Sequence, residues 1–187
     1  SAECMKETAK IQTAVYAGRI KDRQTLLRSS SGGAFTALTN VFLKRGNAVV
    51  AAVYNYQTHR TEFHLILTEE ERDAARGSKY MQSDPGRIFR DALSWLKANP
   101  DKCLLFTGLG CQAEGFRKFA ELKRIRGRVY IVDLICFGSM SPGLWREYAR
   151  SLEKRHHGKI TYLSFRDKRN GWEKPSAYAT INGHEVP

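Results

Sequence analysis

Residues 102–142 contain the stretch that decides the fold, because two apolar runs there each end in a glycine-containing turn that carries a cysteine. The first reads KCLLFTGLGCQAEGF (residues 102–116) and the second reads VYIVDLICFGSMSP (residues 129–142). Each pattern predicts a strand, a turn and the start of a helix. In a parallel sheet, the carboxyl ends of the strands form the crevice where cofactors bind. Two cysteines at two such ends indicate a redox or metal site, and two buried structural thiols are the competing interpretation.

The composition indicates one domain, or two closely joined halves, in a reducing compartment. The chain has 187 residues, of which 42% are hydrophobic, and this is enough to build a core. Its four cysteines are too few and too irregularly spaced for a secreted disulfide scaffold. The sequence has no secretory signal and no apolar run of membrane-spanning length. We therefore expect a cytoplasmic protein without a membrane span.

The net charge of +12 is compatible with several anionic partners. Nucleic acid, an anionic cofactor and an acidic protein are all candidates. The basic residues are spread along the chain, and no known nucleic-acid-binding module accompanies them. We therefore favour a solvated basic surface and predict no nucleic-acid partner.

The predicted elements indicate an α/β fold with a mixed, partly parallel sheet and helices on both of its faces. Residues 103–107, 112–123 and 128–135 predict a right-handed βαβ unit. Further strands are expected at 14–18, 47–54, 61–68 and 159–166, and an Asn-Gly turn predicts a hairpin over 178–186. Further helices are expected at 34–45, 69–75, 86–98 and 142–157.

The chain divides into three predicted parts. Residues 1–13 form a polar N-terminal segment, which we expect to be the end of an upstream domain. Residues 14–84 and 85–187 form the N-terminal and C-terminal parts of the main domain. The first residue is Ser rather than Met, and the second strand of the final hairpin stops almost at once. We therefore expect a fragment of a longer polypeptide that is truncated at its C-terminal end.

Two polar segments are candidate ligand-binding loops. Residues 29–33 (SSSGG) open a helix, where free backbone N–H groups and serine hydroxyls suit a phosphate. A plain serine N-cap is the structural alternative for this segment. Residues 77–84 form a donor-rich loop that could cover a ligand, and a solvated loop is the alternative.

The cysteines alone do not complete an iron–sulfur site. A 4Fe–4S cluster normally takes four thiolates. Cys103 is expected at the start of a strand, far from the crevice that Cys111 and Cys136 would share. We therefore do not expect a complete cluster within this chain.

Five segments, in this order along the chain, resemble the beta subunit of the coenzyme F(420) hydrogenase/dehydrogenase family. Together the resemblance covers roughly residues 14–175. The segments are SSSGGAFTAL (29–38), GSKYMQS (77–83), GLGCQAEG (108–115), DLIC (133–136) and FRDK (165–168).

The resemblance implies a flavin-dependent oxidoreductase that contains FAD and a 4Fe–4S cluster. The flavin would exchange a hydride with a deazaflavin coenzyme or another small redox substrate, and would pass electrons to a redox protein partner or a ferredoxin-like domain. A cationic Lys79 beside the flavin would stabilise its reduced, anionic form. The implied flavin-binding residues are Ser30, Ser31, Gly32 and Gly33 at the phosphates, Ser78, Lys79, Tyr80 and Gln82 along the flavin, and Thr107 and Gly108. The implied cluster ligands are Cys111 and Cys136.

The sequence departs from the family pattern at both cysteines. The family usually reads Gly-Thr-Pro-Cys-Gln, whereas Leu109 and Gly110 precede Cys111 here. It usually has His after the second cysteine, whereas this chain has Phe137, which cannot donate a hydrogen bond or carry a proton. The alternative function is therefore a non-catalytic basic α/β module that docks an acidic protein partner.

Overall fold

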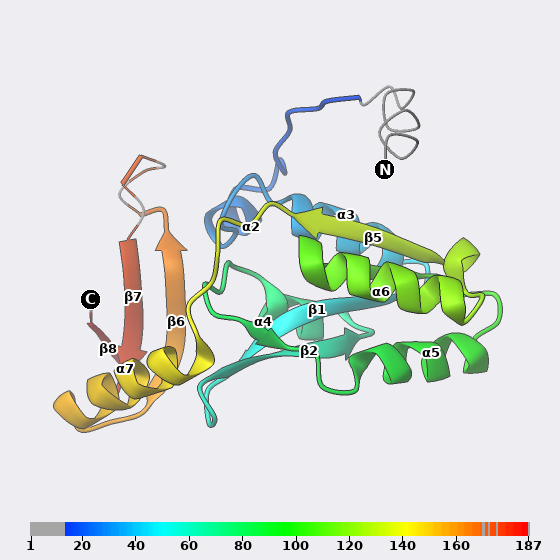
Figure 1. Cartoon of the computed structure of the whole chain (residues 1–187). Helices are drawn as coiled ribbons and strands as arrows, with labels where there is room; N and C mark the ends of the chain where they lie inside the picture. The colour runs from blue at the N-terminus through cyan, green and yellow to red at the C-terminus, as the bar shows by residue number, and fades with distance from the viewer. Residues whose placement is uncertain (1–13, 170, 172, 175, 187) are drawn as a thin grey trace, which may run out of the picture.

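The structure is a computed structural model of the chain and describes residues 14–169, 171, 173–174 and 176–186. The predicted polar segment 1–13 lies outside the described residues. The elements, shown in Figure 1, are α2 (Arg23–Leu27), α3 (Ala34–Leu43), β1 (Ala48–Asn55), β2 (Arg60–Ile66), α4 (Glu69–Ala75), β3 (Ser83–Asp84), α5 (Ile88–Ala98), β4 (Leu104–Leu109), α6 (Gly110–Leu122), the short 3₁₀ helix η1 (Arg126–Arg128), β5 (Val129–Leu134), α7 (Pro142–Arg155), β6 (Ile160–Asp167), β7 (Ser176–Ile181) and β8 (His184–Val186).

The larger sheet is mixed, and it contains the predicted βαβ unit. Its strand order is β3-β2-β1-β4-β5. The pair β1–β2 is antiparallel, whereas β4 is parallel to both β1 and β5. The prediction that β4, α6 and β5 form a βαβ unit is thus confirmed. Both cysteine-bearing turns follow carboxyl ends of adjacent parallel strands.

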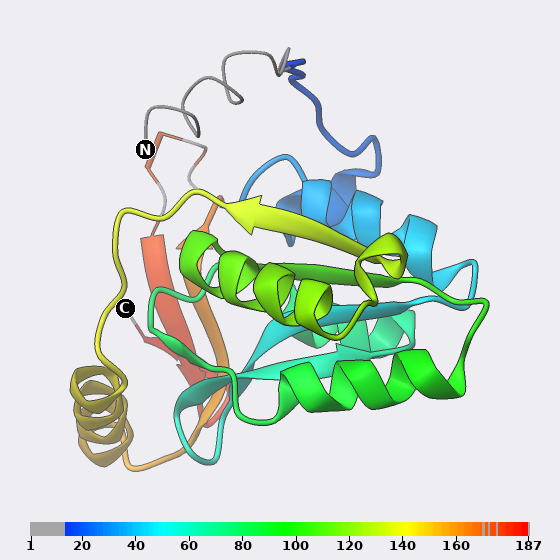
Figure 2. The ribbon, with the colours of Figure 1, turned by 45° about the vertical axis from the view of Figure 1, so that its right-hand side comes forward.

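Helices cover both faces of this sheet because alternate residues of β1 point to opposite sides. Ala48 and Val50 belong to a core with α5 and α6, and Val49 and Ala51 belong to a core with α3 and α4. Figure 2 shows α5 and α6 together on the near side of the sheet, with α3 behind it. A central strand buried on both faces reads as a continuous apolar run. The predicted fold class is confirmed.

The C-terminal strands form a separate sheet, which the sequence did not indicate. Strands β6, β7 and β8 are antiparallel in that order, and α7 packs against them through Trp145, Ala149 and Leu152. The predicted Asn-Gly hairpin is confirmed: Asn182 (φ 51°) and Gly183 (φ 77°) both adopt the left-handed conformation that a two-residue turn requires.

A buried polar network joins the two sheets. Trp145 Nε1 on α7 donates a hydrogen bond to Tyr54 Oη on β1 (2.9 Å), and this hydroxyl lies 3.0 Å from His59 Nδ1. His59 Nε2 lies 3.4 Å from Glu153 Oε1 on α7. Backbone bonds between Tyr80, Gln82 and Met140 add a second connection.

One predicted strand is wrong. Residues 14–18 have no regular secondary structure, and Val15 and Tyr16 are each 90% exposed. An apolar run becomes a strand only when a neighbouring strand pairs with it. Among the described residues, no helix is both long enough and apolar enough to span a membrane.

Replacing Phe106 by Ala should strongly destabilise the fold. Its ring is fully buried and stacks on Phe116 with a centroid distance of 4.4 Å. We expect a loss of about 3–5 kcal/mol in the free energy of unfolding, because the truncation leaves a cavity. Denaturant titration measures this, and Leu122→Ala, at a position 76% exposed, is the control with almost no loss. Equal losses in the two variants would contradict the assignment of the core.

Glu153 should make the fold sensitive to acid. Burial alone would raise its pKa, but hydrogen bonds from Lys159 Nζ (2.8 Å) and Ile160 N (3.0 Å) outweigh burial, so the pKa of Glu153 lies below its usual 4.5. A lowered carboxyl pKa contributes stability above that usual value, and this contribution is lost as the pH falls through the native pKa.

We therefore expect the free energy of unfolding to fall more steeply below pH 4.5 in the wild type than in Glu153→Gln. Urea titrations over a pH series test this, with Glu147→Gln, which removes an exposed carboxylate from the same helix, as the control. Parallel pH profiles for the wild type and Glu153→Gln would show that the carboxylate is not held in this way.

Candidate functional site

A cavity of about 310 Å³ lies beside the carboxyl ends of β4 and β5, where α3 begins. Its walls are largely apolar, with Phe35, Leu38 and Phe63 among them. The charged side chains that line it, among the described residues, are Arg76 and Lys79. A largely apolar cavity with a few cationic groups suits a planar ring that carries an anionic tail.

A second cavity of about 760 Å³ adjoins the first and lies between the two sheets. The two cavities share six lining residues: Ser29, Ser30, Arg76, Gly77, Ser78 and Lys79. Strands β6 and β7 add aromatic side chains to the second cavity, namely Tyr162, Phe165 and Tyr178. Both sheets therefore contribute to it.

A hydrogen bond joins the two polar loops that the sequence singled out. Ser78 N donates to Ser30 Oγ at 2.6 Å, across 48 residues of sequence. Gly33 and Gly77 both have positive φ (82° and 89°), which only glycine adopts without strain. A Cβ built on Gly77 would meet only Ser30 Oγ, at 4.0 Å, so the loop leaves open space there.

A third segment, residues 165–168, binds to the same serine loop. Lys168 is buried at the end of β6, and its Nζ donates to Leu26 O (2.6 Å) and Ser31 O (3.0 Å). Burial lowers the pKa of Lys168. Three segments that are far apart in the sequence thus meet around the two cavities.

The ammonium group of Lys79 is hydrogen-bonded to backbone carbonyls. Its Nζ donates to Ala75 O (2.6 Å), Gly77 O (3.1 Å) and Arg76 O (3.3 Å), at the C-terminal end of α4. Burial lowers the pKa of Lys79 to about 7. The expectation that a cationic Lys79 lies beside a flavin stays a prediction, and in this structure its Nζ already donates to three carbonyls at the end of α4.

The first turn of α3 faces the first cavity and is free of side-chain caps. Its N-cap is Gly33, which has no capping side chain, and Ala34, Phe35 and Thr36 carry no charge. Ala34 and Phe35 line the cavity. The uncapped N–H groups and the helix dipole therefore give this end of the cavity a positive potential.

The structure brings most of the sequence-predicted residues to the first cavity. Those in its lining are Ser30, Ser31, Gly33, Ser78, Lys79, Thr107 and Gly108. The hydroxyl of Thr107 is already used, since it donates to Val50 O at 3.1 Å.

Gly32, Tyr80 and Gln82 line neither cavity. Gly32 O accepts a hydrogen bond from Ile20 N (2.7 Å), and a Cβ on Gly32 would lie 2.6 Å from Gly18 O. The Tyr80 ring packs edge-on against Phe165, and Gln82 N donates to Met140 O. Their positions give them packing roles, and their predicted contacts with a flavin stay predictions.

Cys111 and Cys136 both lie at the carboxyl-end edge of the sheet, and both are exposed. Cys136 Sγ accepts a hydrogen bond from Gly138 N at 3.2 Å. Phe137 is fully exposed. Within the described residues, no three His, Cys, Asp or Glu side chains gather closely enough to bind a metal ion.

Sequence reasoning missed two polar residues of the first cavity. Gln112 lines it and caps α6, with Oε1 accepting a hydrogen bond from Leu109 N at 3.0 Å. Arg76 lines both cavities. Its position directly before the predicted loop at Gly77 was the available signal. The apolar walls carried no signal, because core residues and ligand-contacting residues have the same composition.

Comparisons with known proteins give a consistent result. Residues 15–87 match the family model for the N-terminal part of the beta subunit of coenzyme F(420) hydrogenase/dehydrogenase, and residues 101–185 match the model for the C terminus of the same protein. A chain of the xenon-derivatized F(420)-reducing NiFe hydrogenase complex from Methanosarcina barkeri is similar in fold, with a TM-score of 0.56 and 21% identity over 91% of this chain. The match spans 60% of that chain. No curated protein matches the sequence.

Replacing Lys79 by Met should change how stability depends on alkaline pH. The native pKa of Lys79 is about 7, against 10.5 for a free lysine, so the unfolded state binds more protons between these values. The free energy of unfolding of the wild type should therefore rise with pH across that interval, on the order of 1 kcal/mol per pH unit relative to Lys79→Met. Denaturant titrations measure this, with exposed Lys118→Met as the control. A difference that does not vary with pH would contradict the buried position of the amine.

Proposed function

Because the chain belongs to the coenzyme F(420) hydrogenase/dehydrogenase beta subunit family, we propose that it is a flavin-dependent electron-transfer subunit that binds FAD in the first cavity. The proposal rests mainly on one observation: the segments that resemble the family at 29–38, 77–83 and 165–168 are joined by hydrogen bonds around the two adjoining cavities. Such convergence is expected of segments that share a ligand.

The residues present fit FAD. The apolar walls of the first cavity suit the isoalloxazine ring, and the N-terminus of α3 with Ser30 and Ser31 suits the phosphates. The adjoining second cavity provides further room for a dinucleotide or a small substrate. Bound flavin supplies hydride and single-electron transfer, and the protein orients the ring and excludes water from it.

A 4Fe–4S cluster does not fit the described residues alone. Such a cluster takes four thiolates, and of the described cysteines only Cys111 and Cys136 follow the carboxyl ends of strands. We propose them as two ligands of a cluster whose remaining ligands come from another segment or protein. The similar M. barkeri chain is part of a hydrogenase complex, which supports a redox protein as the partner. A deazaflavin coenzyme or another small redox substrate would be the second reactant.

A non-catalytic docking module is the second candidate. The specific observation that favours it is the exposed apolar segment at 134–137, in which Ile135 is 91% exposed and Phe137 replaces the family's histidine. The net charge of +12 would suit an acidic partner. The two candidates differ in whether the chain binds FAD.

Titration with FAD, followed by flavin fluorescence and absorbance, tests the proposal. We expect saturable binding by the wild type and a loss of at least about tenfold in affinity for Ala34→Trp, because the indole would occupy the cavity beside the helix start. Ala37→Trp is the matched control: Ala37 lies one turn further along α3, is exposed, and lines neither cavity. Saturable binding that is unchanged in Ala34→Trp would place the flavin elsewhere, and no binding by the wild type would favour the docking module.

A further inference from the structure

Two positively charged groups lie beside the first cavity, namely the guanidinium of Arg76 and the N-terminus of α3. Arg76 Nε donates to Thr36 Oγ1 (3.3 Å), which places the guanidinium beside the first turn of α3. The N-terminus of a helix carries about half a positive charge, so a cation is unfavourable there. Asp73 offsets part of this repulsion, because its carboxylate pairs with Arg76 from the side of α4. An anion bound in the cavity would be attracted by both positive groups.

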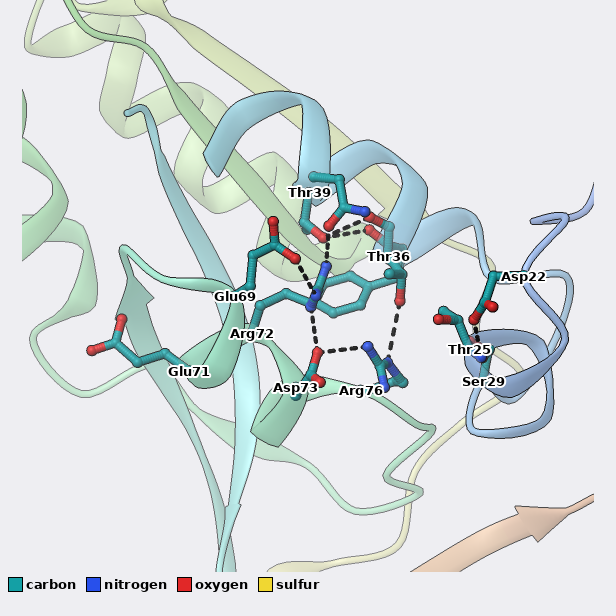
Figure 3. Close-up of polar contacts among 12 residues, drawn as sticks. Asp22, Thr25, Ser29, Thr36, Thr39, Glu69, Glu71, Arg72, Asp73 and Arg76 are labelled. Carbon is teal, nitrogen blue, oxygen red and sulfur yellow. Dashed lines mark hydrogen bonds and ion pairs between the residues drawn. The ribbon is translucent and has the colours of Figure 1, made fainter. Parts of the chain in front are cut away.

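The guanidinium of Arg76 is held in place. Its side chain is 10% exposed, and Nη2 donates to Asp73 Oδ1 at 2.5 Å. Asp73 is itself fixed by Arg72 Nε (2.7 Å), and Arg72 also donates to Asn40 on α3. Figure 3 shows this chain of contacts running from α3 through Arg72 and Asp73 to Arg76 and back to Thr36.

Arg72 and Arg76 share Asp73 but serve different purposes. Arg72 is buried and lines neither cavity, so its contacts account for the packing of α4 on α3. Arg76 lines both cavities, and its Nη1 has no hydrogen-bond partner among the described residues. Burial lowers the pKa of Arg76, and Asp73 opposes this effect. Nη1 therefore remains available to donate to a ligand in the cavities.

Arg76 is also the available cation of the first cavity. The other charged residue in its described lining is Lys79. Its ammonium group donates hydrogen bonds to backbone carbonyls at the C-terminal end of α4. An arginine has a second advantage, because its guanidinium carries several N–H donors. Nε and Nη2 hold the group in place, and Nη1 is left to donate to a phosphate oxygen.

We propose that Arg76, together with the first turn of α3, forms a diphosphate-binding site that selects a flavin dinucleotide over unphosphorylated flavin. The assignment rests on the proposed function for the identity of the ligand, whereas the attraction for an anion follows from Arg76 and the first turn of α3. Thr36 and Asp73 act as positioning residues, since they orient the guanidinium toward the cavity.

The test compares the full chain with Arg76→Gln, Arg76→Lys and the exposed control Arg150→Gln. Inorganic pyrophosphate is titrated against thermal unfolding, and FAD and riboflavin are titrated by flavin fluorescence. We expect pyrophosphate to raise the melting temperature of the wild type and of Arg150→Gln, but not of Arg76→Gln. The dissociation constant for FAD should rise about 10–100-fold in Arg76→Gln, as expected for a lost charged hydrogen bond, while that for riboflavin stays within about threefold.

The variant Arg76→Lys keeps the charge but loses the planar group that Thr36 and Asp73 hold in place, so we expect an intermediate affinity for FAD. Its melting temperature without ligand shows whether the site still folds if Arg76→Gln is unstable. A pyrophosphate effect that is absent from the wild type, or equal in wild type and Arg76→Gln, would overturn the proposal, as would an unchanged FAD-to-riboflavin ratio. A pyrophosphate effect that depends on Arg76, in a wild type that binds no flavin, would reject the proposed function and keep the diphosphate site.

Discussion

The hydrogen bond from Ser78 N to Ser30 Oγ is the contact on which the site depends. It holds the loop after α4 against the loop before α3, and both residues belong to the walls of both cavities. The loop around Ser78 also places Arg76 and Lys79, and the loop around Ser30 leads into the uncapped helix. Together with the bonds from Arg76 to Thr36 and from Arg72 to Asn40, this bond sets the positions of the cationic groups relative to the helix N-terminus. Its short length of 2.6 Å is consistent with a tightly held contact.

The buried polar network between the sheets has a different role. Tyr54, His59, Trp145 and Glu153 satisfy one another, and burial raises the pKa of Tyr54 to about 12, so the hydroxyl stays protonated. Buried polar groups are costly unless each finds a partner. The network can therefore form only when α7 lies correctly against the β1–β2 turn, and it specifies how the two sheets meet.

The sequence predicted those parts of the fold that local chemistry determines. The apolar strand β1, the βαβ unit around Gly108 and the Asn182–Gly183 turn each have a local cause, and each was predicted correctly. The separation of β6–β8 into a second sheet was not predicted, because the pattern of residues in a strand does not determine which strand pairs with it. The strand expected at 14–18 failed for the same reason.

The candidate site was predictable where residues carry recognisable chemistry, as at Ser30 and Ser78. Arg76 was missed because its role depends on Thr36, which only the fold brings to it. Lys79 was recognised, but its ammonium group is engaged by carbonyls at the end of the preceding helix. A tertiary contact therefore positions Arg76, whereas local backbone contacts position Lys79.

The two cavities differ in how they are built, and this has a mechanical consequence. The described walls of the first come from one sheet and its own helices and loops, whereas the second is closed by strands of both sheets. Because β6 and β7 line only the second cavity, a displacement of the smaller sheet would alter the second cavity more directly than the first. A group in the first cavity is thus held by one sheet, whereas a group in the second must fit between two.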